Sequence, residues 1–161
     1  WVNLDPFYSR RIGRAPQGQA PESQFREVPQ GVHILGAAKL TGKSAGGLSV
    51  GVIEAVTSQV NTRIYNDITD ETSYLAAEPL TNFAVGRVQK DINGGNTIIG
   101  GMVTSTIRVL DETTEDYFHK SATTGGIDFT QYFGDMNYIL QLRTAFSGVT
   151  GTEDAIARTQ R

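Results

Sequence analysis

An alternation of side-chain types over residues 98–109 is the feature that most constrains the fold. Apolar or small residues such as Val103 occupy the odd-numbered positions, and most polar residues, including Thr104 and Arg108, occupy even-numbered ones. Because successive side chains of a strand point to opposite faces, this pattern predicts a long strand with one apolar and one largely polar face. Asn-Gly-Gly at residues 93–95 predicts a tight turn before it. Strands in globular domains are usually about five or six residues long, so the apolar face of this longer strand must meet some other phase or layer.

The composition favours an all-β chain. Eighteen glycines accompany many Thr, Val and Ile residues, which are typical of strands and turns. No apolar run reaches the roughly eighteen residues of a membrane helix, whereas a membrane β-barrel shows only alternation. Fourteen Lys and Arg against seventeen Asp and Glu give a net charge of -3, which argues against a nucleic-acid binder. The chain has no cysteine, hence no disulfide and no thiolate chemistry.

The rest of the chain repeats the same rhythm of strands and connections. Strands are predicted at residues 1–12, 32–40, 48–58, 80–92, 98–110, 121–133 and 137–148. Long irregular segments are predicted at 15–31, 59–77, 111–120 and from 149 onward, the second with a short strand extension near 62–65, and short turns at 41–47, 93–95 and 134–136. Long and short connections therefore alternate, as they do in outer-membrane barrels with short periplasmic turns and longer external loops. We predict one all-β segment over residues 1–161, an antiparallel up-and-down meander of about seven strands that is part of a transmembrane outer-membrane β-barrel.

Glu54 breaks one of the apolar faces. It shares a strand face with Val52 and Val56. Either a bulge near Gly51 shifts the register, or Glu54 lies near the water interface, and the sequence leaves both explanations open.

Aromatic residues gather near the predicted strand ends. They are Tyr8, Phe83, Tyr132, Phe133, Tyr138 and Phe146. They would suit the aromatic girdle of a membrane barrel, and ordinary core packing explains each of them equally well.

Basic and polar strand residues are the candidate functional residues. A charge that faces lipid costs about 2–4 kcal/mol at the middle of the membrane, so charged strand residues should point into a barrel. We predict a lumen lined by Arg10, Lys39, Arg87, Thr104, Thr106, Arg108, Gln141 and Arg143. Wall charges set selectivity, so this set could form an anion- or sugar-selective path. The alternative is a packed interior without a path, in which the basic groups pair with Asp91, Asp128 and Glu54.

Three motifs that suggest other chemistry fail on their spacing. Residues 36–44 resemble a phosphate-binding loop but have five residues between the glycines instead of four, and a strand follows instead of a helix. His33 and His119 are far apart and lack partners for metal binding or general-base catalysis. The acidic segments 67–71 and 111–116 carry oxygen ligands but not the calcium-loop spacing. We therefore expect no cofactor, no metal and no enzymatic activity.

Three blocks of the sequence resemble a known family. They are FYSRRIGRAPQG at 7–18, ILGAAKLTGK and GLSVGV within 34–52, and EPLTNF and VGRVQ within 78–89. The chain is similar to bacterial outer-membrane β-barrel domains of unknown function, which in full-length proteins usually follow an N-terminal module similar to family 9 carbohydrate-binding modules. The resemblance runs from about residue 5 to 150 and implies a piece of a longer barrel. It brings no catalytic residues. A start at Trp1 without an initiating Met fits a processed chain or an excerpt.

These observations together predict a non-enzymatic segment of the bacterial outer membrane with a channel-like or anchoring role. A link to glycan handling follows if the resemblance extends so far. The expected partner is the lipid bilayer, with other outer-membrane or surface proteins as further candidates and no nucleic acid. The alternative is a soluble all-β binding module whose acidic loops contact a ligand, and a folded monomer that needs no detergent would favour it.

Overall fold

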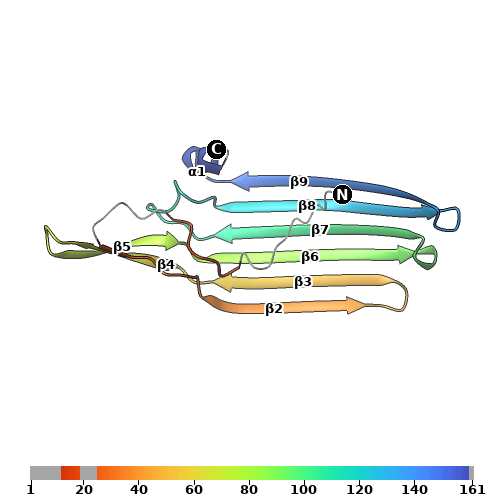
Figure 1. Ribbon diagram of the computed structural model, residues 1–161, viewed down its shortest axis with the longest axis horizontal. Helices are drawn as coiled ribbons and strands as arrows, with labels where there is room; N and C mark the ends of the chain where they lie inside the picture. The colour runs from red at the N-terminus through yellow and green to blue at the C-terminus, as the bar shows by residue number, and fades with distance from the viewer. Residues whose placement is uncertain (1–11, 19–24, 160–161) are drawn as a thin grey trace.

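The computed structural model describes residues 12–18 and 25–159 and is built from two antiparallel sheets (Figure 1). The large sheet has six strands in the order β2-β3-β6-β7-β8-β9. Its strands are β2 (Ile34–Lys43), β3 (Leu48–Thr57), β6 (Thr81–Ile92), β7 (Thr97–Arg108), β8 (Ser121–Phe133) and β9 (Tyr138–Thr150). The small sheet has the order β1-β4-β5, with β1 (Phe25–Glu27), β4 (Val60–Asn66) and β5 (Glu71–Glu78).

The large sheet is an up-and-down meander with one insertion. Each strand pairs with its neighbour in sequence, except that β3 pairs with β6 because the β4–β5 hairpin lies between them in the chain. The small sheet projects beyond one end of the large sheet (Figure 1). The three short turns β2–β3, β6–β7 and β8–β9 lie at the opposite end (Figure 1). We call these two ends the loop end and the turn end.

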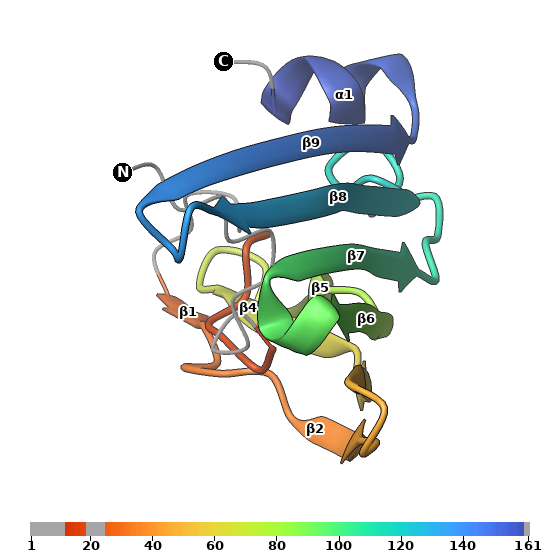
Figure 2. The same ribbon diagram turned by 90° about the vertical axis from the view of Figure 1, so that its right-hand side faces the viewer.

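The large sheet is a single twisted layer, as Figure 2 shows. Among the described residues, its strands make extensive contacts only with their hydrogen-bonded neighbours. The strands β2 and β9 are its edges, so the sheet does not close into a barrel within the described ranges. The chain is therefore all-β and antiparallel, with both faces of its main sheet uncovered by a second sheet.

Six of the seven predicted strands are confirmed, with bounds that shift by at most three residues. The remaining one, at residues 1–12, falls almost wholly outside the described residues. Two predictions were wrong: the segment 59–77 forms the β4–β5 hairpin, of which only a strand near 62–65, within β4, was predicted, and β1 lies within the predicted loop 15–31. In β4 the buried Val60 and Thr62 alternate with the exposed Asn61 and Arg63, but so short an alternation with one threonine is a weak signal for a strand.

The polar tail also contains structure that was not predicted. Helix α1 (Glu153–Thr159) follows β9, and the Ala155 amide donates to the Thr152 side chain at 3.3 Å at its start. Glu153 and Asp154 occupy its first turn, where negative charge stabilises the amino end of a helix.

The buried core is small for a chain of this length. Its apolar members are Val32, Ala55, Val60, Ala77, Val85, Phe118 and Ala155. A single-layer sheet has nothing stacked on its faces, so most of its large apolar side chains stay exposed. The fold therefore leaves apolar surface that a compact soluble domain of this size would bury.

Candidate functional site

One face of the large sheet, here called the apolar face, presents large apolar side chains outward from all six strands. They are Leu40 on β2, Leu48, Val50 and Val52 on β3, Val88 and Ile92 on β6, Ile99, Val103 and Ile107 on β7, Ile127 and Phe133 on β8, and Tyr138, Leu140, Leu142 and Phe146 on β9. Their exposed fractions run from 37% to 71%. The surface is continuous, because paired residues in neighbouring strands share a face.

Two charged residues of the six strands lie on the apolar face, each toward one end. Lys90, near the turn end, donates from its Nζ to the Gly46 carbonyl at 2.6 Å. Glu54, toward the loop end, accepts a hydrogen bond from the Asn82 side chain. Glu54 pairs with Ala84, which is six residues from Lys90 on β6, or roughly 20 Å along a strand that rises about 3.3 Å per residue. With a tilt of about 40° the distance is about 15 Å, shorter than the apolar band of about 25 Å in membrane barrels.

The strand register excludes one of the two explanations for Glu54 that the sequence left open. The pairing of β3 with β2 is regular from Ser49 to Val56, and its pairing with β6 is regular from Leu48 to Thr57. The irregularity in the β2–β3 pair lies between Ile34 and Gly36, so the proposed bulge near Gly51 is wrong. Glu54 is on the apolar face because the strand is regular, and it lies near the strand's loop end.

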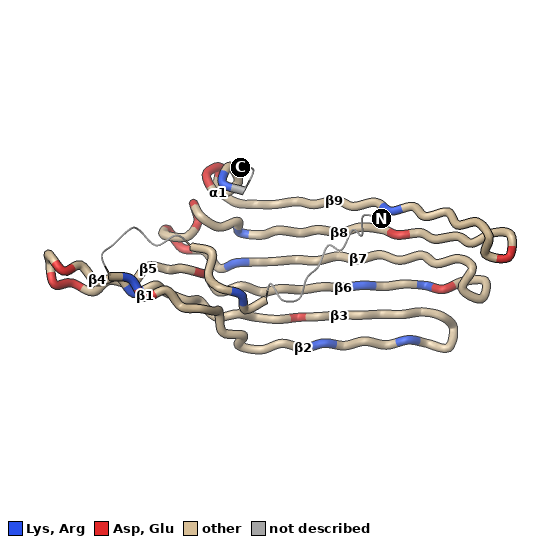
Figure 3. The backbone as a smooth tube through the Cα atoms, viewed as in Figure 1, with Lys and Arg blue, Asp and Glu red and all other residues tan. Residues whose placement is uncertain are grey.

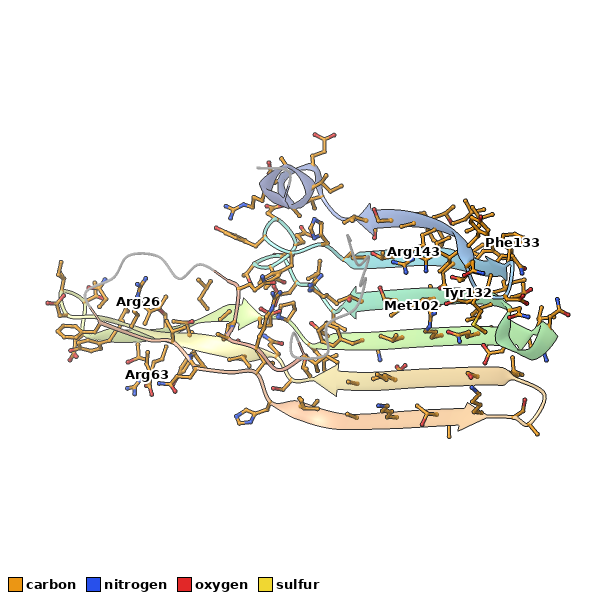
Figure 4. All side chains as sticks on the ribbon, turned by 45° about the vertical axis from the view of Figure 1, so that its right-hand side comes forward. Arg26, Arg63, Met102, Tyr132, Phe133 and Arg143 are labelled. Atoms are coloured by element: carbon orange, nitrogen blue, oxygen red, sulfur yellow. The ribbon has the colours of Figure 1, made fainter. Side chains whose placement is uncertain are left out.

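The aromatic residues divide between the two faces. Phe133 and Tyr138 pair directly across β8 and β9 on the apolar face, next to the turn (Figure 4). Phe146 is on the same face, and its ring covers Gly125, where a Cβ would overlap it. Phe83 lies on the opposite face and is half-buried. The structure therefore brings Phe133, Tyr138 and Phe146 to the surface that a girdle would use, and it places Phe83 away from it.

The opposite face, here called the polar face, carries seven of the eight residues predicted to line a lumen. They are Lys39, Arg87, Thr104, Thr106, Arg108, Gln141 and Arg143. The eighth, Arg10, lies outside the described residues. The strand register alone places them on one face, because paired residues of adjacent strands point to the same side of the sheet. Whether this face borders a lumen stays a prediction.

A chain of polar contacts crosses the polar face from β2 to β8. Lys43 Nζ donates to Asp91 Oδ2 at 3.3 Å, and Gln89 Nε2 donates to Asp91 Oδ1 at 3.1 Å. Arg87 then donates to Gln89 Oε1 at 3.3 Å and to both carboxylate oxygens of Asp128, at 2.9 and 3.2 Å. This two-pronged geometry is the strong form of an Arg–carboxylate pair. The sequence shows this alternation only at Arg87, Gln89 and Asp91 of β6. Their partners on β2 and β8 can be identified only from the strand register.

Gly100 makes this contact chain possible. It lies on β7, between Gln89 of β6 and Asp128 of β8 in the same cross-strand row. A Cβ at this position would come within 2.5 Å of Asp128 Oδ2. The missing side chain lets the Asp128 carboxylate extend across β7 to Arg87, two strands away. Sequence reasoning did not identify this role.

Two chain segments cover the loop end of the polar face. Arg108 Nη1 donates to the His119 carbonyl at 3.1 Å, and its guanidinium lies 6.0 Å from the Phe118 ring centre. The Arg108 Nε atom is buried without a hydrogen-bond partner. From the other side, the Gln17 amide donates to Glu78 Oε2 at 2.9 Å. At the loop end, the polar face is therefore more covered and less open to water than in its middle.

The connection between β7 and β8, which covers Arg108, is held in shape by the carboxylate of its own Asp111. Asp111 Oδ1 accepts from the Thr113 amide at 3.0 Å and from the hydroxyls of Thr113 and Thr114 at 2.7 and 2.8 Å. These hydrogen bonds hold the pKa of Asp111 below its ordinary value. Burial, and secondarily the nearby Arg108 charge, lower the pKa of His119, so His119 is neutral at pH 7.

The other candidate motifs do not converge on a site. Residues 36–44 belong to β2 and the turn into β3, so a strand and not a helix follows the lysine. Lys43 is engaged by Asp91. Within the described ranges, no three His, Asp or Glu side chains come close enough together to hold a metal ion. The Asp70 carboxylate of the β4–β5 turn accepts instead from the Tyr65 hydroxyl at 2.9 Å.

A single-layer antiparallel sheet with one apolar and one polar face defines the structural class. The family model described as Domain of unknown function (DUF5916) matches residues 3–153, and the chain belongs to this family. None of the curated proteins and none of the solved structures matches this chain. In residues 12–18 and 25–159, no helix is long and apolar enough to cross a membrane.

Proposed function

We propose that this chain forms part of the wall of a β-barrel in the bacterial outer membrane, with a channel-like or anchoring role. The apolar face contacts lipid, and the polar face lines the interior. The observation that supports this proposal is a single sheet layer that exposes fifteen large apolar side chains on one face and gathers its Arg and Asp side chains on the other. The proposal assigns no catalytic step to the chain.

The apolar face is too large to remain in contact with water. Burial of a large apolar side chain is worth about 1.5–3 kcal/mol. The fifteen side chains are roughly half exposed, so leaving them in water loses on the order of 10 kcal/mol of stabilisation. That is comparable to the whole stability of an ordinary domain, about 5–15 kcal/mol. The apolar face is therefore covered in the functional state.

Lipid fits this face better than a second protein layer does. The two charged residues, Lys90 and Glu54, lie toward its opposite ends and leave a band without charged side chains between them. The short turns gather at one end and the long connections at the other, which is the asymmetry of outer-membrane barrels. A soluble sandwich gains nothing from either arrangement.

Closure of the barrel needs further strands. The edges β2 and β9 each have one hydrogen-bonded neighbour among the described strands, so their outer backbone groups are open to pairing. Lipid cannot satisfy these groups. Since bacterial barrels have at least eight strands, at least two more complete the wall.

Two adjacent positions on β7 test the proposal. Val103 lies on the apolar face and Thr104 on the polar face. In the intact protein, Val103→Arg places a charge in lipid at a cost of about 2–4 kcal/mol, whereas Thr104→Arg places the same charge inside. We expect Val103→Arg to reduce the amount assembled in the outer-membrane fraction and Thr104→Arg to assemble normally, as measured by membrane fractionation and flotation.

Two results would contradict the proposal. One is a wild-type protein that is folded and monomeric without detergent and does not float with lipid, which would favour the soluble binding module. The other is equal assembly of the two arginine variants.

A further inference from the structure

We infer that the polar face forms a path that prefers small anions, such as phosphate- or carboxylate-bearing solutes, over cations. The inference rests on the proposed barrel wall and specifies what its interior admits. It follows from how the strand charges are distributed, from which of them are already paired, and from their spacing.

The polar face is positively charged although the chain is not. It carries five basic side chains, Lys39, Lys43, Arg87, Arg108 and Arg143, against two acidic ones, Asp91 and Asp128. The face has a net charge of three positive, whereas the whole chain has a net charge of -3. Most acidic residues lie outside the large sheet (Figure 3).

The two acidic residues lie near the turn end (Figure 3). From the row of Arg87 to the loop end, the charged residues of the polar face are Arg87, Lys39 and Arg108, all of them basic. Arg87 and Lys39 lie in successive rows on strands two apart, which is roughly 7 Å along the strands and roughly 10 Å across them. Their separation of about 12 Å exceeds the Debye length of about 8 Å at physiological ionic strength, so their fields overlap strongly only at low ionic strength.

Two of the basic groups are free to attract a solute. Lys43 and Arg87 are engaged by Asp91 and Asp128. Arg143 lies directly opposite Asp128 on the neighbouring strand, but Arg87 already occupies both oxygens of that carboxylate.

Lys39 and Arg143 are both exposed, and neither has an ion-pair partner within the described part of the chain. They stand on β2 and β9, the two edge strands, and Arg143 lies just on the turn side of the middle of β9 (Figure 4). Free cations therefore flank the central Arg87–Asp128 pair on both sides.

Charged groups inside a barrel act strongly on passing ions. Low-dielectric walls focus the field of the wall charges and raise the local concentration of counter-ions. Rings or rows of Arg and Lys are the devices by which pores select anions. A packed, fully paired interior would need five acidic partners, and this sheet supplies two. If the remaining strands of the barrel supplied the other three acidic partners, the path would lose its preference for anions. A measurement of ion selectivity detects that loss.

The experiment measures ion selectivity of the intact protein in planar bilayers under a KCl gradient. We expect a reversal potential that reports a preference for chloride over potassium. Replacing the two free cations together, Lys39→Gln with Arg143→Gln, should lower the chloride-to-potassium permeability ratio by about tenfold at low ionic strength. The effect should shrink as salt screens the charges.

Lys90→Gln is the control, because it removes one positive charge, half the change in the double variant, from the apolar face of the same sheet. It should leave the permeability ratio unchanged. Membrane assembly is scored separately by flotation. A protein that assembles but does not conduct, prefers cations, or keeps its ratio in the double variant overturns the anion path and leaves the barrel wall standing. Failure of the wild type to assemble overturns both.

Discussion

Gly100 is the residue on which the polar face most directly depends. Gly100→Ala would place a Cβ 2.5 Å from Asp128 Oδ2 and displace that carboxylate from Arg87. Overpacking of this kind costs about 1–3 kcal/mol. We expect a lower midpoint of thermal unfolding for the intact protein in detergent, followed by the heat-dependent shift in gel migration.

The neighbouring glycine is the control for this substitution. At Gly101, which lies on the apolar face, the nearest atom to an added Cβ is the Gly126 carbonyl oxygen at 3.8 Å, an ordinary contact. Gly101→Ala should therefore unfold near the wild-type midpoint. Equal midpoints for the two alanine variants would show that the Asp128 carboxylate does not need the space above Gly100.

Asp111 is expected to make the connection after β7 sensitive to acid. Its folded pKa is lowered, so its stabilisation is complete above the unfolded value of about 3.9 and is lost as the pH falls through the lower folded value. Hydrogen exchange over residues 111–118, corrected for the intrinsic rate, should lose protection in that acidic window. Asp111→Asn removes the titrating group and should show no such step, and a step that persists in this variant would assign the sensitivity to another group.

At the scale of the element, alternation predicted the strands that have one apolar and one polar face. Residues 80–92 and 121–133 were placed within a residue of β6 and β8, because a strand that separates two environments alternates most clearly. The assignment of Lys39, Arg87 and Arg143 to one face followed from the same period.

The β4–β5 hairpin shows where this reasoning fails. Strand β4 buries only Val60 and Thr62, residues 71–74 of β5 are exposed, and the turn places Asp70 at a φ of 54°. Strands that bury so few residues leave too short an alternation to recognise in the sequence, so only the pairing identifies them.

The contact chain of the polar face was beyond sequence reasoning for a different reason. Arg87 and Asp128 are 41 residues apart and meet across an intervening strand. That meeting depends on the register of three strands and on the absence of a side chain at Gly100. Neither can be read from one strand at a time.

For the whole molecule, the difference between its two ends predicts an orientation. The short turns should face the periplasm, and the β4–β5 hairpin and other long connections should face outward. An epitope inserted in the β4–β5 turn, where Ile68 is 87% exposed, should bind antibody on intact cells. The same epitope in the β8–β9 turn at residues 134–136 should bind only after the outer membrane is opened. The reverse pattern would invert the proposed orientation.

The central claim is that the two faces of one sheet meet two different phases, and β7 tests it most directly. The chain contains no cysteine, so single cysteines can be placed at each position from 101 to 107 of the intact, membrane-assembled protein and labelled with a fluorophore. A lipid-borne quencher should quench the fluorophore at odd positions, including Val103, and a water-soluble quencher should quench it at even positions, including Thr104. Quenching without a period of two, or aqueous quenching at the odd positions, would contradict the central claim.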